Sequence, residues 1–309
     1  MKNQRLIFVV ATIVCLVPLA SFGAEWRVPG DYATIQAAIN STSVLAGDKI
    51  IVGSGEHAGA LVTKAVEIKG EDGAAITSGP AHSSGLIMGF RMLAGSNGCS
   101  ISHLRFTVDL AIMNGDAVHD VSVSHCTFEN SIQAVSNWRG NSWQITHNDI
   151  IDLRTRNGGG IGVLIGDFTG GTVVDNVVAH NKITGALHMG ANEKGKYNGS
   201  GIVLYADFRW GRLGAAAIQY NQVMKNKIAM TSDNPVLVDI VAVELTDTRN
   251  NPGIIPPVIN NNKIMFNDWR DTAKGYAWTP DNLDAYNAIS RNLGKNRGHG
   301  LHPHVFGPE

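Results

Sequence analysis

Short stretches in which apolar and polar residues alternate recur along most of the chain, joined in pairs by a brief interruption. After residue 100 the interruption lies within one phrase: apolar, two polar residues, a small or amide residue, any residue, then usually apolar. Ile145-Thr-His-Asn148-Asp-Ile150 and Val178-Ala-His-Asn181-Lys-Ile183 are two clear copies. Alternation places every second side chain on one face. Each copy therefore predicts two short strands that share a buried side and meet at a bend.

The copies of this phrase are unevenly spaced. Their fourth residues are Leu104, Cys126, Asn148, Asn181, Asn226, Asn262 and Asn292, so the intervals run from 22 residues (104 to 126) to 45 (181 to 226). Such variation would disturb the packing of a helical repeat, whereas a coiled stack of strands lets its loops grow outward. We expect the amides at 148, 181, 226, 262 and 292 to form an internal column that bonds from coil to coil. Leu104 and Cys126 extend it as apolar positions.

The first 23 residues have the organisation of a secretory signal. Lys2 and Arg5 precede an apolar run from Leu6 to Leu19, and small residues follow at Ser21 and Gly23. The run is too short to span a bilayer comfortably. We divide the chain into a signal peptide (1–23), one strand-stack domain (24–295) and a C-terminal tail (296–309). The mature protein is expected to be secreted or periplasmic, with no membrane span after signal cleavage.

Both ends of an open strand stack need covering, because its terminal coil exposes core and unpaired backbone. Thr34 or Asp31 is placed to cap a short amphipathic helix, with Ile35, Ala38 and Ile39 on one face. This helix is the predicted N-terminal plug. The aromatic residues Trp269, Tyr276 and Trp278 are expected to cover the far end.

Composition narrows the function without choosing it. The formal charge is −1 with no basic cluster, so nucleic acid is not an expected partner. After signal removal the cysteines are Cys99 and Cys126. They occupy different inward columns, which predicts two buried thiols rather than a disulfide. Nothing in the sequence sets the oligomeric state.

The opening Val28-Pro-Gly-Asp-Tyr-Ala-Thr-Ile-Gln-Ala-Ala-Ile39, the strand after Gly47-Asp48 and the Asn-centred coils resemble the pectate-lyase-like superfamily, over Val28 to about Asn292. The resemblance implies an all-β fold: a right-handed single-stranded parallel β-helix, built from the repeats typical of these proteins, with a short N-terminal capping α-helix. Members include polysaccharide lyases, glycoside hydrolases, phage tailspikes and periplasmic β-helix proteins tied to copper-enzyme maturation. Neither the Asp-Asp pair of polygalacturonases nor the Gly-Arg-Pro-Trp of methylesterases is present, so no catalytic residue is carried over.

A second repeat places carboxylates at regular intervals. Asp167, Asp207 and Asp247 follow similar strands, 40 residues apart. If these strands stack, neighbouring carboxylates lie about 5 Å apart, which suits a shared Ca²⁺ or the carboxyl pair of a retaining glycosidase. Asp167, Asp207 and Arg209 are therefore the candidate catalytic residues, and the three aspartates the candidate metal ligands. The alternative is that each Asp is an ordinary turn residue after a strand.

Other side chains offer binding rather than chemistry. Trp138 and Arg139, and Trp210 with Arg212, lie in predicted loops, where an indole face and a guanidinium suit an acidic sugar. His103, His125, His147 and His180 each precede the internal column by one residue. They form either a solvated outer column or a site for a soft metal ion. His299, His302 and His304 in the tail carry the same two interpretations.

Two classes of function follow. The first is an exported protein that binds or processes a polysaccharide along the side of the helix, as a lyase or hydrolase, in a groove past Asp167, Asp207 and Arg209. The second is a non-catalytic scaffold at the cell surface or in the periplasm, with a metal-handling protein as its variant. The sequence leaves open whether catalysis occurs.

Overall fold

The computed structural model describes residues 23–190, 193, 195, 197–209, 213–249, 258–279, 283–294, 297–298, 303 and 305–308. All but the last residue of the predicted signal peptide lie outside this range. Five of the residues proposed above for binding also lie outside it: Trp210, Arg212, His299, His302 and His304.

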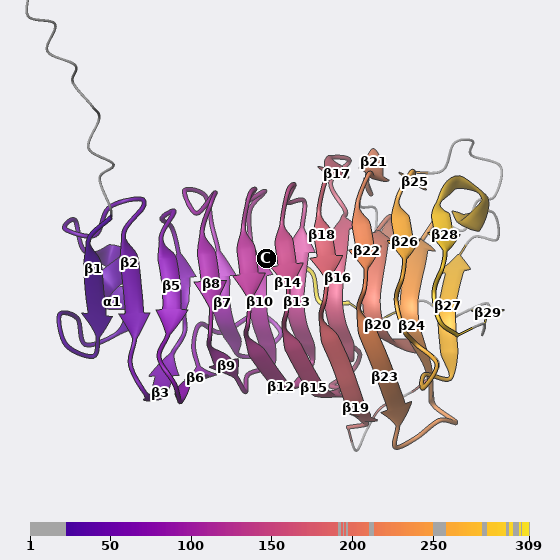
Figure 1. The fold of residues 1–309 in the computed structure, drawn as a ribbon, viewed down its shortest axis with the longest axis horizontal. Coiled ribbons are helices and arrows are strands. Elements are labelled where there is room, and N and C mark those ends of the chain that lie inside the picture. Colours follow the sequence, from indigo (N-terminus) through magenta and orange to yellow (C-terminus); the bar gives the residue numbers. More distant parts are fainter. Residues whose placement is uncertain are drawn as a thin grey trace, which may run out of the picture.

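The chain winds into a stack of coils whose strands form three long sheets and one short one (Figure 1). Sheet A contains β1 (Glu25–Val28), β2 (Lys49–Val52), β5 (Glu67–Gly70), β8 (Ser100–Ser102), β11 (Ser122–Ser124), β14 (Gln144–Thr146), β18 (Val177–Ala179), β22 (Gln222–Met224), β26 (Lys263–Met265) and β28 (Ala288–Ser290). Sheet B contains β3 (Gly55–Ala58), β6 (Ala74–Ser78), β9 (Arg105–Phe106), β12 (Thr127–Ser131), β15 (Asp149–Arg154), β19 (Lys182–His188) and β23 (Lys227–Ser232).

Sheet C contains β4 (Ala60–Val62), β7 (Met88–Met92), β10 (Leu110–Asn114), β13 (Gln133–Trp138), β16 (Ile161–Asp167), β20 (Tyr197–Ala206), β24 (Val238–Asp247), β27 (Lys274–Thr279) and β29 (Arg297–Gly298). The short sheet contains β17 (Thr172–Val174), β21 (Ala217–Gln219) and β25 (Ile259–Asn260). Neighbouring strands in each sheet come from successive coils, and every pairing between them is parallel, as in Val123↔Ile145. The predicted right-handed parallel β-helix is confirmed.

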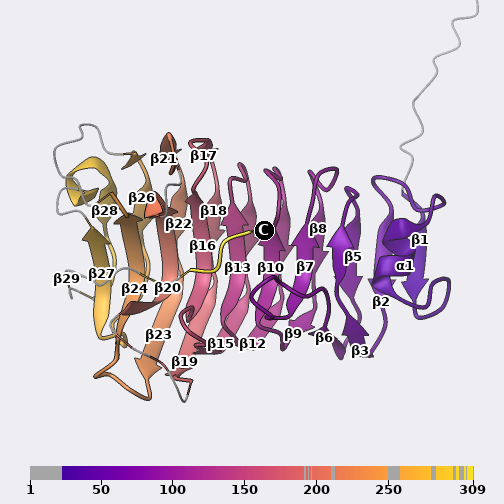
Figure 2. The ribbon, with the colours of Figure 1, turned by 180° about the vertical axis from the view of Figure 1, so that it is seen from behind.

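A helix closes the N-terminal end of the stack (Figure 2). α1 (Ile35–Asn40) begins after Thr34, whose hydroxyl accepts a hydrogen bond from the Ala37 amide at 3.1 Å. Its buried residues are Ile35, Ala38 and Ile39, so the predicted plug and its apolar face are confirmed.

At the opposite end, aromatic side chains pack together beside the 3₁₀ turn η2 (Leu283–Tyr286). The ring of Tyr276 lies 5.9 Å from that of Trp269 and 5.1 Å from that of Trp278. Both tryptophans are 2% exposed and belong to the main hydrophobic core.

The internal amides form two ladders rather than the one predicted column. The first runs through Asn148, Asn181, Asn226, Asn267 and Asn292 at the bend between sheets A and B. The second runs through Asn176, Asn221, Asn262 and Asn287 at the other end of the sheet A strands. The assignment of Asn262 to the first column was therefore wrong. It precedes strand β26, whereas Asn267 follows that strand and occupies the equivalent bend.

The left-handed residue of each bend in the first ladder is the one before the Asn. It has positive φ, for example His147 at 57° and Lys225 at 57°. The Asn points inward, and its amide takes the place of a turn hydrogen bond. Cys126, in the same column, is buried and free, as is Cys99, and burial raises the pKa of each thiol to about 12.

Part of the C-terminal tail lies against the outer face of sheet C (Figure 2). Phe306 donates its amide to the Gln133 side chain at 2.6 Å and lies edge-on to the His82 ring. Val305 and Phe306 pack on an apolar patch of this face, formed by Leu86, Met88, Leu110, Met113, Ile132, Trp138, Ile161, Leu164, Val203 and Tyr205. Within the described residues, no helix is long and apolar enough to cross a membrane.

Candidate ligand-binding edge

Four consecutive strands of sheet C end side by side, and most of the side chains proposed from sequence gather there. Trp138 ends β13, Asp167 ends β16, Asp207 follows β20 and Asp247 ends β24. Parallel pairing in the register Trp138↔Gly166↔Tyr205↔Thr246 brings the four strand ends to one edge of the helix.

Arginine and aromatic side chains form a continuous stack along this edge. The guanidinium of Arg139 lies 5.4 Å from the centre of the Phe168 ring, and Phe168 lies edge-on to Trp138 at 5.5 Å. Trp138 lies edge-on to Tyr205 at 6.1 Å, and the guanidinium of Arg209 lies 5.5 Å from the centre of the Tyr205 ring. We call these five residues the arginine–aromatic edge. A similar contact follows on the next coil, where the guanidinium of Arg249 lies 4.5 Å from the centre of the Phe208 ring.

The Asp167 carboxylate shapes the turn that carries Phe168. One oxygen accepts hydrogen bonds from the Thr169 amide (3.1 Å) and hydroxyl (2.8 Å), and the other accepts from the Gly171 amide at 2.7 Å. The side chain is fully buried. These are the contacts of an aspartate that organises a turn after a strand.

Asp207 and Asp247 each hold an arginine two residues later. Asp207 accepts from the Arg209 amide at 2.9 Å and from its guanidinium at 3.1 Å. Asp247 accepts from the Arg249 amide at 3.0 Å and from its guanidinium. Both carboxylates are at most 2% exposed. Their role in this geometry is to hold each arginine close to the neighbouring aromatic ring.

The equal 40-residue spacing does not put the three aspartates in one register. Asp167 pairs with Ala206, and Ala206 pairs with Asp247, so Asp207 lies one residue further along its coil. Their oxygens already accept from amides, a hydroxyl and guanidinium groups, which leaves a poor donor set for the hard, oxygen-rich coordination of Ca²⁺. In the described part of the chain, no three His, Cys, Asp or Glu side chains cluster to hold a metal ion.

Two buried donors at the edge have no acceptor among the described residues. They are Nε1 of Trp138 and Nε of Arg139. Another nitrogen of Arg139 donates to the Gly115 carbonyl at 2.7 Å. A buried donor without an acceptor costs about 1–3 kcal/mol, so such groups usually meet water or a ligand. Both nitrogens lie beneath the surface of the edge.

A buried carboxyl lies close to this edge on the outer face of sheet C. Glu244 is 1% exposed and accepts hydrogen bonds from the hydroxyls of Ser200 and Thr246, both at 2.7 Å. Burial raises its pKa to about 7, although these hydroxyls and the charge of Lys274 oppose the shift. Near neutral pH this carboxyl therefore takes up or releases a proton readily.

The structure places Trp138 and Arg139 on either side of Phe168. Trp138 ends a strand and is fully buried, whereas the sequence placed it in a loop. The sequence analysis missed Phe168, which directly follows Asp167, and Arg249, which lies two residues after Asp247. Considering the two residues after each strand-end Asp would have found both. Glu244 was missed too. The sequence signal for Glu244 is a charged residue at a position where the two preceding coils have the apolar residues Val203 and Leu164.

Comparisons with known proteins add little to this geometry. No protein-family model matches the chain, and no curated protein matches it. Among solved structures, it is similar to the catalytic domain of a GH87 alpha-1,3-glucanase D1068A in complex with tetrasaccharides, with 12% identity and a TM-score of 0.36 over 91% of this chain and 68% of that one. It is also similar to the D1069A form of such a domain, with 14% identity and a TM-score of 0.34 over 91% of this chain and 69% of that one. Likenesses at these values carry no argument about activity.

Proposed function

We propose that this protein is exported and binds a polysaccharide along the arginine–aromatic edge of sheet C. The observation that carries the proposal is the unbroken stack from Arg139 through Phe168, Trp138 and Tyr205 to Arg209. Sugar rings present apolar C–H faces and polar rims, which suit the partly exposed Phe168 ring beside Arg139. Trp138 and Tyr205 are fully buried, so they support the exposed side chains from beneath and do not contact the ligand. A stack that crosses several coils, each about 4.8 Å from the next, suits a polymer better than a single sugar.

Arg139 selects for an acidic or oxygen-rich sugar. Its guanidinium is half-buried and lies against Phe168, and its Nε lacks an acceptor among the described residues. A bond from guanidinium to carboxylate is charge-assisted and roughly twice as strong as a neutral one. Since Arg209 and Arg249 are already paired with Asp207 and Asp247, Arg139 is the cation that a ligand meets first.

Binding, rather than cleavage, is the activity that the arrangement favours. The oxygens of Asp167, Asp207 and Asp247 are held by donors from their own turns. Glu244 is buried beneath other side chains, so it does not reach a ligand at the edge. Binding in this proposal does not require Ca²⁺, because the three aspartates are engaged by their own turns and arginines and do not form a coordination site.

A glycan array with neutral and acidic polysaccharides tests the proposal, read for bound protein and for released product, with and without Ca²⁺. Arg139→Asn is the informative variant, since Asn tolerates the positive φ of 67° at this position. Arg105→Ala is the control, because Arg105 forms an exposed ion pair with Glu129 on sheet B. We expect Arg139→Asn to weaken binding at least tenfold and the control to bind like wild type. No retained glycan, or equal binding by both variants, would overturn the proposal and favour a scaffold.

A further inference from the structure

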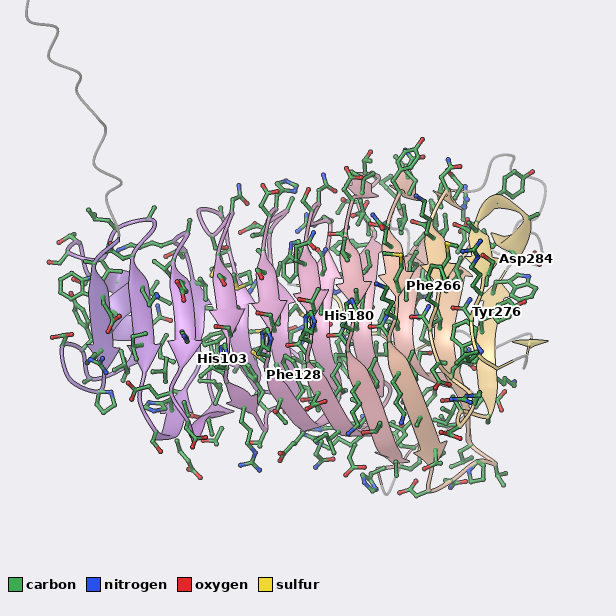
Figure 3. The ribbon with its side chains drawn as sticks, in the orientation of Figure 1. His103, Phe128, His180, Phe266, Tyr276 and Asp284 are labelled. Carbon is green, nitrogen blue, oxygen red and sulfur yellow. The ribbon has the colours of Figure 1, made fainter. Side chains whose placement is uncertain are left out.

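Four histidines form a column on the surface of the bend between sheets A and B, after the sheet A strands that follow the edge of sheet C along the chain. His103, His125, His147 and His180 follow β8, β11, β14 and β18, and all four are exposed. Figure 3 labels His103 and His180, the two ends of this histidine column. Neighbouring rings are 5.2, 5.2 and 4.9 Å apart, with interplanar angles of 9°, 4° and 5°.

The backbone holds these rings in place. Each histidine has φ between 55° and 58°, the left-handed conformation that turns the chain from sheet A into sheet B. The residue after each is buried, and the later ones are fixed by the first amide ladder, in which Cys126 and Asn148 donate to the next coil's Asn at 3.0 Å. The four imidazoles therefore repeat at the coil spacing, on a rigid frame.

We propose that neighbouring imidazoles of the histidine column clamp a divalent transition metal ion, two rings to each ion, with water completing its coordination. Imidazole is a favoured ligand of Zn²⁺, Cu²⁺ and Ni²⁺. A metal–nitrogen bond of about 2.0–2.1 Å needs the two nitrogens within roughly 4 Å. In the stacked arrangement the ring lone pairs point side by side, so binding requires each exposed imidazole to rotate about its side-chain torsions until one nitrogen of each ring faces the ion.

Adjacency sets the stoichiometry. Four rings make three neighbouring pairs, and two ions at most are bound at once, through 103/125 and 147/180. The column of ligands stops at Lys225 on the next coil and at Gly70 before His103, since neither residue supplies an imidazole. The clamp uses two ligands, consistent with the finding that the described residues hold no cluster of three.

The test compares two double variants that remove the same number of histidines. His103→Asn/His180→Asn leaves the neighbours His125 and His147. His103→Asn/His147→Asn leaves His125 and His180 separated by a coil. Asn tolerates positive φ and is a poor metal ligand, so both variants keep the bend. Cu²⁺ and Zn²⁺ are titrated into the full-length proteins by calorimetry, with the variant lacking all four histidines as baseline and circular dichroism as the fold check.

The proposal predicts that the adjacent-pair variant keeps one ion near wild-type affinity, and that the separated variant binds at least tenfold more weakly. Nitrogen splitting in the Cu²⁺ electron paramagnetic resonance spectrum should report two imidazoles in the first variant and fewer in the second. Equal binding by the two double variants, or wild-type binding no stronger than the baseline, would overturn it. This inference is independent of polysaccharide binding, so either proposal can fail alone.

Discussion

Asn181 donates its side-chain amide to the side-chain oxygen of Asn226 on the next coil at 3.0 Å. The Asn181 oxygen in turn accepts from the backbone and side-chain amides of Asn148, both at 3.0 Å. From Asn148 to Asn267, each amide of the first ladder thus donates to the next coil and accepts from the preceding one. This relationship joins coils whose strands are only two to ten residues long, and it satisfies polar groups inside an apolar core.

Breaking this ladder at its centre should be costly. Asn181→Ala removes the acceptor for two donors of Asn148 and the donor for the Ile145 carbonyl, all of them buried. At about 1–3 kcal/mol for each of the three unsatisfied groups, we expect the free energy of unfolding to fall by at least about 3 kcal/mol. Urea denaturation measures it. Asn40→Ala at the exposed end of α1 is the control, and equal effects from the two changes would contradict the role of the ladder.

The bend residue before each Asn carries backbone strain unless it is glycine. Lys225 has φ 57°, so Lys225→Gly should change stability by no more than about 1 kcal/mol, since relief of strain offsets the entropy of glycine. Lys225→Val should lose about 1–3 kcal/mol, because a β-branched residue resists this conformation. Thermal unfolding of both variants checks the order. A valine variant as stable as the glycine variant would show that the turn does not impose the conformation.

Glu244 should make stability depend on pH. Its native pKa of about 7 lies above the ordinary 4.5, so between these values the native state binds more protons than the unfolded state. Stability contributed by this group is therefore full below about pH 4.5 and falls as pH rises to 7, by roughly 3 kcal/mol.

Glu244→Gln mimics the protonated carboxyl and should remove this slope, making the variant more stable than wild type at pH 8. Urea unfolding at pH 5, 6, 7 and 8 follows the effect. Glu129→Gln, at an ion pair on sheet B, should leave the slope in place. An unchanged slope in Glu244→Gln would show that the buried carboxyl is not its source.

The C-terminal segment should shield the apolar face of sheet C. Phe306 packs on that face and is held by the Gln133 side chain. Phe306→Ala should cost about 1–3 kcal/mol, somewhat less than for a fully buried Phe, and should increase binding of an apolar dye to the exposed patch. Val236→Ala, at a side chain that is 86% exposed, is the control. No gain in dye binding would mean that the segment does not cover the face.

The strand stack was predictable because its signals are local. The alternation in Val121-Ser-Val123 and the Asn phrases predict which strand positions are buried. Thr34, together with Ile35 and Ile39, predicts the capping helix. Which bend an Asn occupies is not local. Asn262 and Asn267 lie in overlapping phrases, and only the pairing of β26 with β22 decides between them.

The candidate site was harder to predict, because its geometry depends on register. The spacing of Asp167, Asp207 and Asp247 is regular, yet Asp207 falls one position out of line. The contact between Trp138 and Tyr205 joins residues 67 positions apart across coils of different length. The sequence could therefore suggest candidate residues, but their contacts could be predicted only once the register between coils was known.

The most direct test of the proposed function is a hydrogen-exchange footprint of the protein with the acidic polysaccharide that the array retains best. The account predicts added protection at the strand ends around residues 138–139, 166–168 and 205–209, and none in sheet B. Protection confined to sheet A or sheet B, or the same footprint in Arg139→Asn as in wild type, would contradict it.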